Sequence, residues 1–93
     1  NRKGYEVIAH HYDIQCETDM VVSPIESEYD VVIHKAVATD AGGSTYTAYG
    51  EAHASDVAQD VMVRMSDTRA YKRAVSRASG VGMIAVEELQ GEL

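Results

Sequence analysis

The sequence is poor in the residues that usually build large cores and covalent cross-links. It has no Phe, no Trp, one Pro and one Cys among 93 residues. A lone cysteine excludes an internal disulfide, so we expect a cytoplasmic rather than a secreted setting. No apolar run approaches the roughly 20 residues of a transmembrane helix, and we therefore expect no membrane-spanning segment.

Basic residues are scarce as well. Fifteen Asp and Glu stand against eight Lys and Arg, which gives a net charge of −7. This balance disfavours nonspecific attraction to a polyanion unless the cations are gathered in one place. The acidity, the shortage of lysine and the small apolar residues are similar to haloarchaeal protein composition, which implies a halophilic, archaeal origin. The length predicts a single domain over residues 1–93, and a start at Asn1 without Met is consistent with a fragment of a longer chain.

The cations are in fact gathered, because five of the eight lie between Arg64 and Arg77. They fall in residues 54–83, which we predict to form one long helix. Ser55 is a suitable N-cap for that helix. No proline or glycine interrupts the run before Gly80, which is placed to leave the helix with positive φ.

Two faces are expected on this helix at about 100° per residue. The outer face is basic and holds Arg69, Lys72, Arg73 and Arg77, whereas Val63, Ala70, Tyr71, Ala74, Val75 and Ala78 form a thin packing face. Patterning alone favours a solvated surface ridge over a binding face. Asp67 projects among the packing residues and needs a partner there. Lys35 on the sheet is one candidate, and Arg64 or Tyr71 within the helix are the alternatives.

Three strands precede the helix. Alternation of apolar and polar residues predicts strands over 5–18, 28–39 and 44–52, and residues 40–43 carry a hairpin signal. Gly50 inside the third strand indicates a bulge or a close backbone approach. The predicted fold class is α+β, a three-stranded antiparallel meander followed by one long helix packed on the sheet. Its two exposed edges favour a homo-oligomer that pairs through them.

Residues for covalent or metal chemistry are sparse. His10 and His11 are adjacent, so on a strand they would point to opposite faces and could not easily share a metal. Cys16 is more typical of a buried thiol than of a nucleophile. No phosphate-binding loop or metal motif is present. We therefore expect no cofactor, no metal and no enzymatic activity.

The segment 65–82, MSDTRAYKRAVSRASGVG, resembles the helix-to-glycine signature of the Rad-type single-strand annealing proteins of recombinational repair. Members tend to carry an acidic residue, Thr-Arg-Ala, a basic-Ala-aliphatic run and Gly-aliphatic-Gly. The segment 46–54 is also similar to their glycine-containing last strand. The resemblance implies binding of single-stranded DNA along a basic groove beside the helix, annealing, and assembly into rings or filaments. The implied DNA contacts are Arg69, Lys72 and Arg73, with Lys35 and Arg77 as further candidates.

Two functions thus remain in view. The first is a single-stranded DNA-binding, annealing-like module in recombination or repair, which acts through phosphate contacts and tyrosine stacking without covalent chemistry. The second is a protein-interaction or self-assembly module of the same fold, whose basic helix face docks on an acidic surface. Ion pairs between subunits at the basic residues would favour the second.

Overall fold

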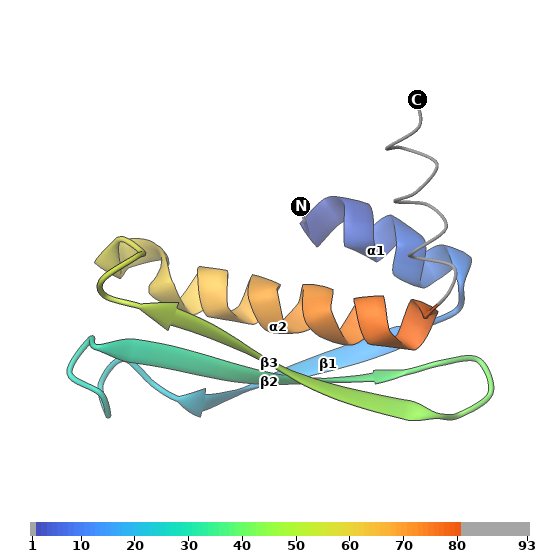
Figure 1. Ribbon diagram of the computed structural model, residues 1–93, viewed down its shortest axis with the longest axis horizontal. Helices are drawn as coiled ribbons and strands as arrows, with labels where there is room; N and C mark the ends of the chain where they lie inside the picture. The colour runs from blue at the N-terminus through green and yellow to red at the C-terminus, as the bar shows by residue number, and fades with distance from the viewer. Residues whose placement is uncertain (1, 81–93) are drawn as a thin grey trace.

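The computed structural model describes residues 2–80, and Figure 1 shows both helices on one side of a three-stranded sheet. The strand order is β1-β2-β3, and both pairs are antiparallel. The longer helix, α2, packs mainly on β2 and β3. This confirms the predicted α+β arrangement of a three-stranded meander followed by a helix on the sheet. The elements are α1 (Arg2–His11), β1 (Gln15–Val22), β2 (Val31–Thr39), β3 (Thr45–His53), a single 3₁₀ turn η1 (Gln59–Val61) and α2 (Met62–Ser79).

The strand predicted over residues 5–18 is wrong in its first half, because residues 5–11 lie in α1 and only residues 15–18 belong to β1. Tyr5, Ile8 and Ala9 recur at helical spacing as well as within the apparent alternation. Ala9 is buried and Tyr5 packs at the margin of the same core cluster. The local sequence fits both a strand and a helix, and packing against α2 favours the helix.

α1 ends in a left-handed turn at Asp13, whose φ is 55°. The Ile14 amide donates to the Ala9 carbonyl at 2.7 Å, and the Asp13 amide donates to the His10 carbonyl at 3.2 Å. These two bonds satisfy helix-terminal carbonyls in the Schellman pattern, which usually uses glycine at this position. Because Asp13 stands where glycine is usual, the sequence carries no glycine signal for the end of α1.

α2 begins at Met62, later than the predicted start at residue 54. The intervening residues turn back toward β3, because the Asp56 carboxylate accepts the His53 amide at 3.1 Å. The Ala54 amide donates to the Asp30 carbonyl, which ties the same turn to the start of β2. Ser55 therefore does not cap α2, whose N-cap residue is Val61.

The other end of α2 agrees with the prediction. Gly80 follows the helix with φ 54° and donates its amide to the Ser76 carbonyl. The predicted continuation to residue 83 and the apolar tail after it lie outside the described residues. Within residues 2–80, no helix has the length and apolar character needed to cross a membrane.

The hairpin between β2 and β3 is also confirmed. Asp40 organises it: one carboxylate oxygen accepts the Gly42 and Ser44 amides, each at 3.0 Å. The other carboxylate oxygen accepts the Tyr46 hydroxyl, and these bonds hold the pKa of Asp40 below its usual value. Gly43 supplies the positive φ, 88°, that closes the turn.

Small residues bring α2 unusually close to the sheet. Gly50 on β3 is buried against the backbone of α2, where an added Cβ would overlap the Ser66 carbonyl oxygen and the Ala70 amide nitrogen. Of the two alternatives predicted for Gly50, the structure shows the close backbone approach and not a bulge, because the β2–β3 register runs through it without a shift. The surrounding contact is lined by fully or nearly fully buried alanines from the strands and the helix: Ala36, Ala38, Ala48, Ala52, Ala70 and Ala74. Because the core contains alanines and no Phe or Trp, the helix and the sheet are separated by only a small distance.

Gly50→Ala is expected to destabilise the fold by about 1–3 kcal/mol, because the new methyl group meets backbone that cannot rotate away. Urea unfolding followed by circular dichroism would measure it as a lower midpoint with an unchanged slope. Gly42→Ala is the matched control, since its Cβ would meet only the Asp40 carboxylate at 3.5 Å. Equal stability of the two variants would contradict the close approach as the cause.

A buried polar pair crosses the same interface. His34 on β2 is 6% exposed, and its Nδ1 forms a hydrogen bond with the Oγ of fully buried Ser66 on α2. Burial lowers the pKa of His34, while nearby Asp67 opposes that shift. The neutral imidazole is therefore the form that the folded state favours.

The stability of the fold should fall as the pH drops below the unfolded-state pKa of histidine, about 6.5. Below that pH the unfolded chain binds a proton that folded His34 resists, so protonation favours unfolding; above it the effect is absent. Urea midpoints at pH 7.5 and 5.5 should differ less in His34→Gln than in the parent chain. Exposed His10→Gln should leave the difference intact, and an equal change in both variants would contradict the assignment.

Candidate nucleic-acid interface

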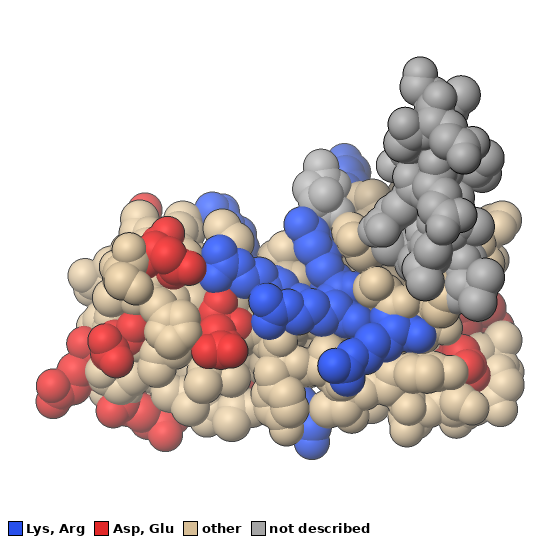
Figure 2. Space-filling model, in the orientation of Figure 1, with Lys and Arg blue, Asp and Glu red and all other residues tan. Residues whose placement is uncertain are grey.

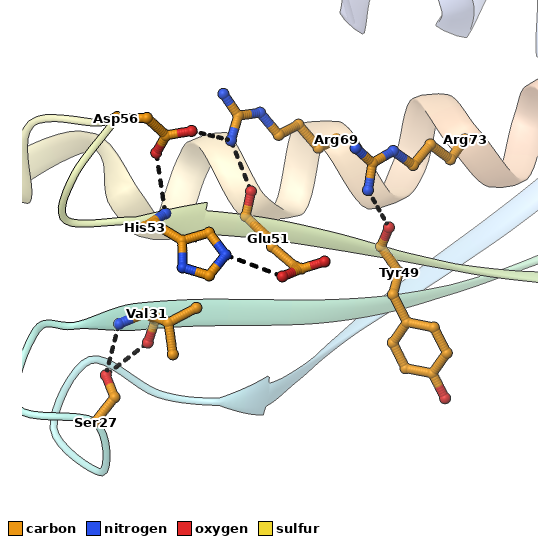
Figure 3. Close-up of polar contacts among 8 residues, drawn as sticks. All are labelled: Ser27, Val31, Tyr49, Glu51, His53, Asp56, Arg69 and Arg73. Carbon is orange, nitrogen blue, oxygen red and sulfur yellow. Dashed lines mark hydrogen bonds and ion pairs between the residues drawn. The ribbon is translucent and has the colours of Figure 1, made fainter.

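Three arginines of α2 reach over the outer edge of β3. Arg69, Arg73 and Arg77 each donate a hydrogen bond from Nη1 to a main-chain carbonyl of that strand. The acceptors are Glu51 at 2.7 Å, Tyr49 at 2.7 Å and Thr47 at 2.6 Å, in that order. Figure 3 shows the first two of these contacts. We call the three side chains the arginine ladder.

The ladder exists because two periods coincide. Arginines four apart on a helix are separated by about 6.0 Å along its axis. Every second residue of a strand is separated by about 6.6–6.8 Å. Because the helix runs antiparallel to β3, each step of four along α2 meets a step of two back along the strand. An edge strand presents alternate carbonyls outward without a strand to receive them, and the ladder supplies the missing donors.

The guanidinium groups keep most of their binding capacity. A guanidinium has five N–H donors and stays charged at all relevant pH values. Arg73 and Arg77 each donate to a neutral carbonyl, which leaves the positive charge uncancelled. Arg69 also approaches the Asp56 carboxylate at 3.6 Å, but that carboxylate is half exposed and the pair is correspondingly weak.

Lys72 widens the basic surface toward α1. Its Nζ lies 5.8 Å from the centre of the Tyr5 ring, within the range of a cation–π contact. A groove of about 330 Å³ lies here, lined by Tyr5, Lys72, Arg73, Ser76 and Arg77. Figure 2 shows the basic side chains gathered along the middle of this face, with acidic side chains concentrated toward one end. We call Arg69, Lys72, Arg73 and Arg77 the basic stripe.

The predicted candidates therefore divide into two groups. Four of the five form the basic stripe, as their helical spacing predicted. Lys35 lies on β2 with Ile33 and Val37, on the face of the sheet that the helices leave uncovered, whereas its neighbours Ala36 and His34 face α2. Lys35 is directly opposite Tyr49 on β3. The side chain thus belongs to a different surface from the stripe.

Asp67 has a partner that none of the sequence-based alternatives named. Its Oδ2 accepts a hydrogen bond from Arg2 Nη1 at 2.8 Å, so the ion pair joins α1 to α2. The same guanidinium lies 4.3 Å from the centre of the Tyr71 ring and 3.4 Å from a Glu6 carboxylate oxygen. Arg2 therefore clamps α1 against the helix that carries the stripe. The other oxygen of Asp67 is buried and makes no hydrogen bond within residues 2–80.

Two further observations concern reactive side chains in the described part of the chain. Burial raises the pKa of the Cys16 thiol, so the thiolate is disfavoured at neutral pH. No group of three or more His, Cys, Asp or Glu among residues 2–80 is placed to hold a metal ion. The contacts that the basic stripe makes are hydrogen bonds and one ion pair.

Sequence reasoning missed the role of the strand in the site. The i, i+4, i+8 spacing of the ladder arginines is visible in the sequence, and so is the alternation of β3. What could not be read is which edge of the sheet lies beside the helix. That depends on the crossing of α2 over Gly50, which is a tertiary property.

Comparisons with known proteins identify no relative: no protein-family model, no curated protein and no solved structure matches the chain.

A double-mutant cycle tests the clamp. Arg2→Ala should cost about 1–3 kcal/mol of unfolding free energy, because it leaves the partly buried Asp67 carboxylate unpaired. Asp67→Ala should cost less, since the freed arginine can turn to solvent. The double variant should show a coupling of about 1 kcal/mol by urea unfolding. Exposed Arg64→Ala serves as control, and strict additivity of the two clamp variants would contradict the pairing.

Proposed function

We propose that this chain is a single-stranded DNA-binding, annealing-like module of DNA recombination or repair, which works by phosphate contacts without covalent chemistry. The observation that carries the proposal is the arginine ladder. It fixes a row of guanidinium groups at the edge of β3 with most of their donors still available to a ligand. Preorganised cations lose less conformational entropy when they bind than flexible ones do.

The rest of the stripe supports a linear anionic ligand. The groove beside Lys72 and Arg77 continues the basic surface along α2 instead of closing into a deep pocket. The segregation matters because the chain as a whole carries a charge of −7 and would otherwise repel a polyanion. The resemblance of residues 65–82 to annealing proteins points to the same ligand.

The ladder also bears on self-association. Its three bonds already occupy outward carbonyls of β3, so a strand added at that edge would have to displace them. If subunits pair through sheet edges, we propose that β1 is the edge they use.

A protein-interaction or self-assembly module is the second candidate, and charge segregation favours it. The end of the molecule away from the stripe exposes several carboxylates: Glu26, Glu28, Asp30 and Asp60. Such an end could dock on the stripe of another copy. Sedimentation at low salt, with and without the stripe variant described next, separates the two candidates because only self-docking would give stripe-dependent oligomers without DNA.

Removal of stripe cations should weaken the binding of a fluorescent single-stranded oligonucleotide and reduce its salt dependence. In the parent chain the logarithm of affinity should fall linearly with the logarithm of salt concentration. Arg69→Ala/Lys72→Ala/Arg73→Ala should reduce that slope by about 2, at about 0.7 for each phosphate that is no longer neutralised. A matching duplex should bind more weakly than the single strand.

Two further variants make this test specific. Lys3→Ala/Arg64→Ala removes exposed cations outside the stripe and should change affinity little. Arg69→Lys/Arg73→Lys/Arg77→Lys keeps the charge but loses the fork geometry, so it should retain the salt slope with weaker affinity. Circular dichroism verifies folding in each case. Absence of binding at low salt by the folded parent chain would refute the proposal.

A further inference from the structure

The face of the sheet opposite the helices is not covered in the described part of the chain. The central strand, β2, presents Val31, Ile33, Lys35 and Val37 there, and all four are only partly buried. β3 presents Thr47, Tyr49 and Glu51 beside them. Tyr49 lies on this face with 49% of its surface exposed.

Tyr49 contacts the ladder through its backbone and lies on this open face with its side chain. Its carbonyl oxygen accepts the bond from Arg73, while its side chain points to the other side of the strand, away from α2 (Figure 3). Lys35 lies directly opposite it on β2. A cation at the strand edge and a cation on the sheet therefore flank one exposed ring.

The ring of Tyr49 has no structural partner of the kind that several other tyrosines have. Tyr46 donates its hydroxyl to Asp40, and Tyr71 lies beneath Arg2. Tyr5 faces Lys72. Among residues 2–80, the hydroxyl of Tyr49 makes no hydrogen bond and its ring stacks on no aromatic side chain. An exposed, unpaired aromatic ring on a sheet is a stacking platform for unpaired bases.

We propose that Tyr49 is a base-stacking site: a strand held by its phosphates on the arginine ladder turns a base over the edge of β3 onto this ring, beside Lys35. The proposal rests on the function proposed above and adds where the bases go. The neighbours Thr47 and Val37 are small enough to leave the ring surface open. The charged side chains of the open face also favour a base, and not a phosphate, at Tyr49.

The charges on the open face separate phosphates from bases. Beyond Lys35, the open face carries Asp19 and Glu17 on β1, which lie opposite Lys35 and Val37. Carboxylates there repel phosphates, so the ladder side of β3 is the more favourable place for a nucleic acid backbone. Glu51, beside Tyr49 on β3, adds one carboxylate at that edge, where it contacts His53. Uncharged bases can cross onto the face as far as Tyr49 and Lys35. The acidic β1 side thus favours a base over a phosphate on the open face.

The test compares two ligands that have the same phosphates. One is an oligodeoxythymidine, and the other is an abasic oligomer of equal length. The parent chain should bind the first about tenfold more tightly, the gain expected when a base stacks on an aromatic ring. Tyr49→Ala should reduce this ratio to about one while leaving abasic affinity unchanged, because the carbonyl that anchors Arg73 is retained. Tyr49→Phe should keep the ratio, and Tyr12→Ala, an exposed tyrosine elsewhere, should not alter it.

Each outcome separates this inference from the proposed function. Equal, stripe-dependent binding of both ligands by the parent chain would overturn the stacking site and leave the phosphate-binding function standing. A base-dependent ratio that survives Tyr49→Ala, or a loss of both ligands in that folded variant, would also overturn it. Failure of the folded parent chain to bind either ligand would refute both proposals.

Discussion

The close approach of α2 to β3 at Gly50 is the constraint on which the rest of the structure depends. A side chain at that position would overlap the helix backbone, and larger residues in place of the flanking alanines would hold the helix farther away. Only at this short separation can arginine side chains reach past the helix and bond the carbonyls of the strand edge. The small residues that replace Phe and Trp in the core therefore allow the helix to come close enough for the ladder to form.

The ladder gives one set of side chains two tasks. It satisfies outward carbonyls of an edge strand, which an unprotected sheet would offer to other strands. It also holds the guanidinium groups in a row, and their positive charge remains because the carbonyl acceptors are uncharged. The clamp between Arg2 and Asp67 adds α1 to the same helix, and Lys72 then faces Tyr5 across a shallow groove. Packing, edge protection and the basic stripe are consequences of one helix position.

Much of this could be predicted from the sequence, and the remainder could not for identifiable reasons. The hairpin at Asp40, the close approach at Gly50 and the basic face of α2 follow from local patterns and were predicted. α1 was missed because its residues fit both periods and its terminal turn uses Asp13 in place of glycine. The partner of Asp67 and the surface of Lys35 could not be read, because both depend on which elements meet across the fold. The strand contributes backbone carbonyls to the site, and every residue has one, so the sequence does not indicate which of them take part.

Nuclear magnetic resonance of the arginine side chains during titration with an oligodeoxythymidine would test the central claim most directly. We expect the guanidinium resonances of Arg69, Arg73 and Arg77 to be restricted already in the free protein. We also expect them to shift together on binding, with the amide resonances of β3, while Arg64 does not change. Freely rotating guanidinium groups before titration, or shifts confined to the acidic loop between β1 and β2, would contradict this claim.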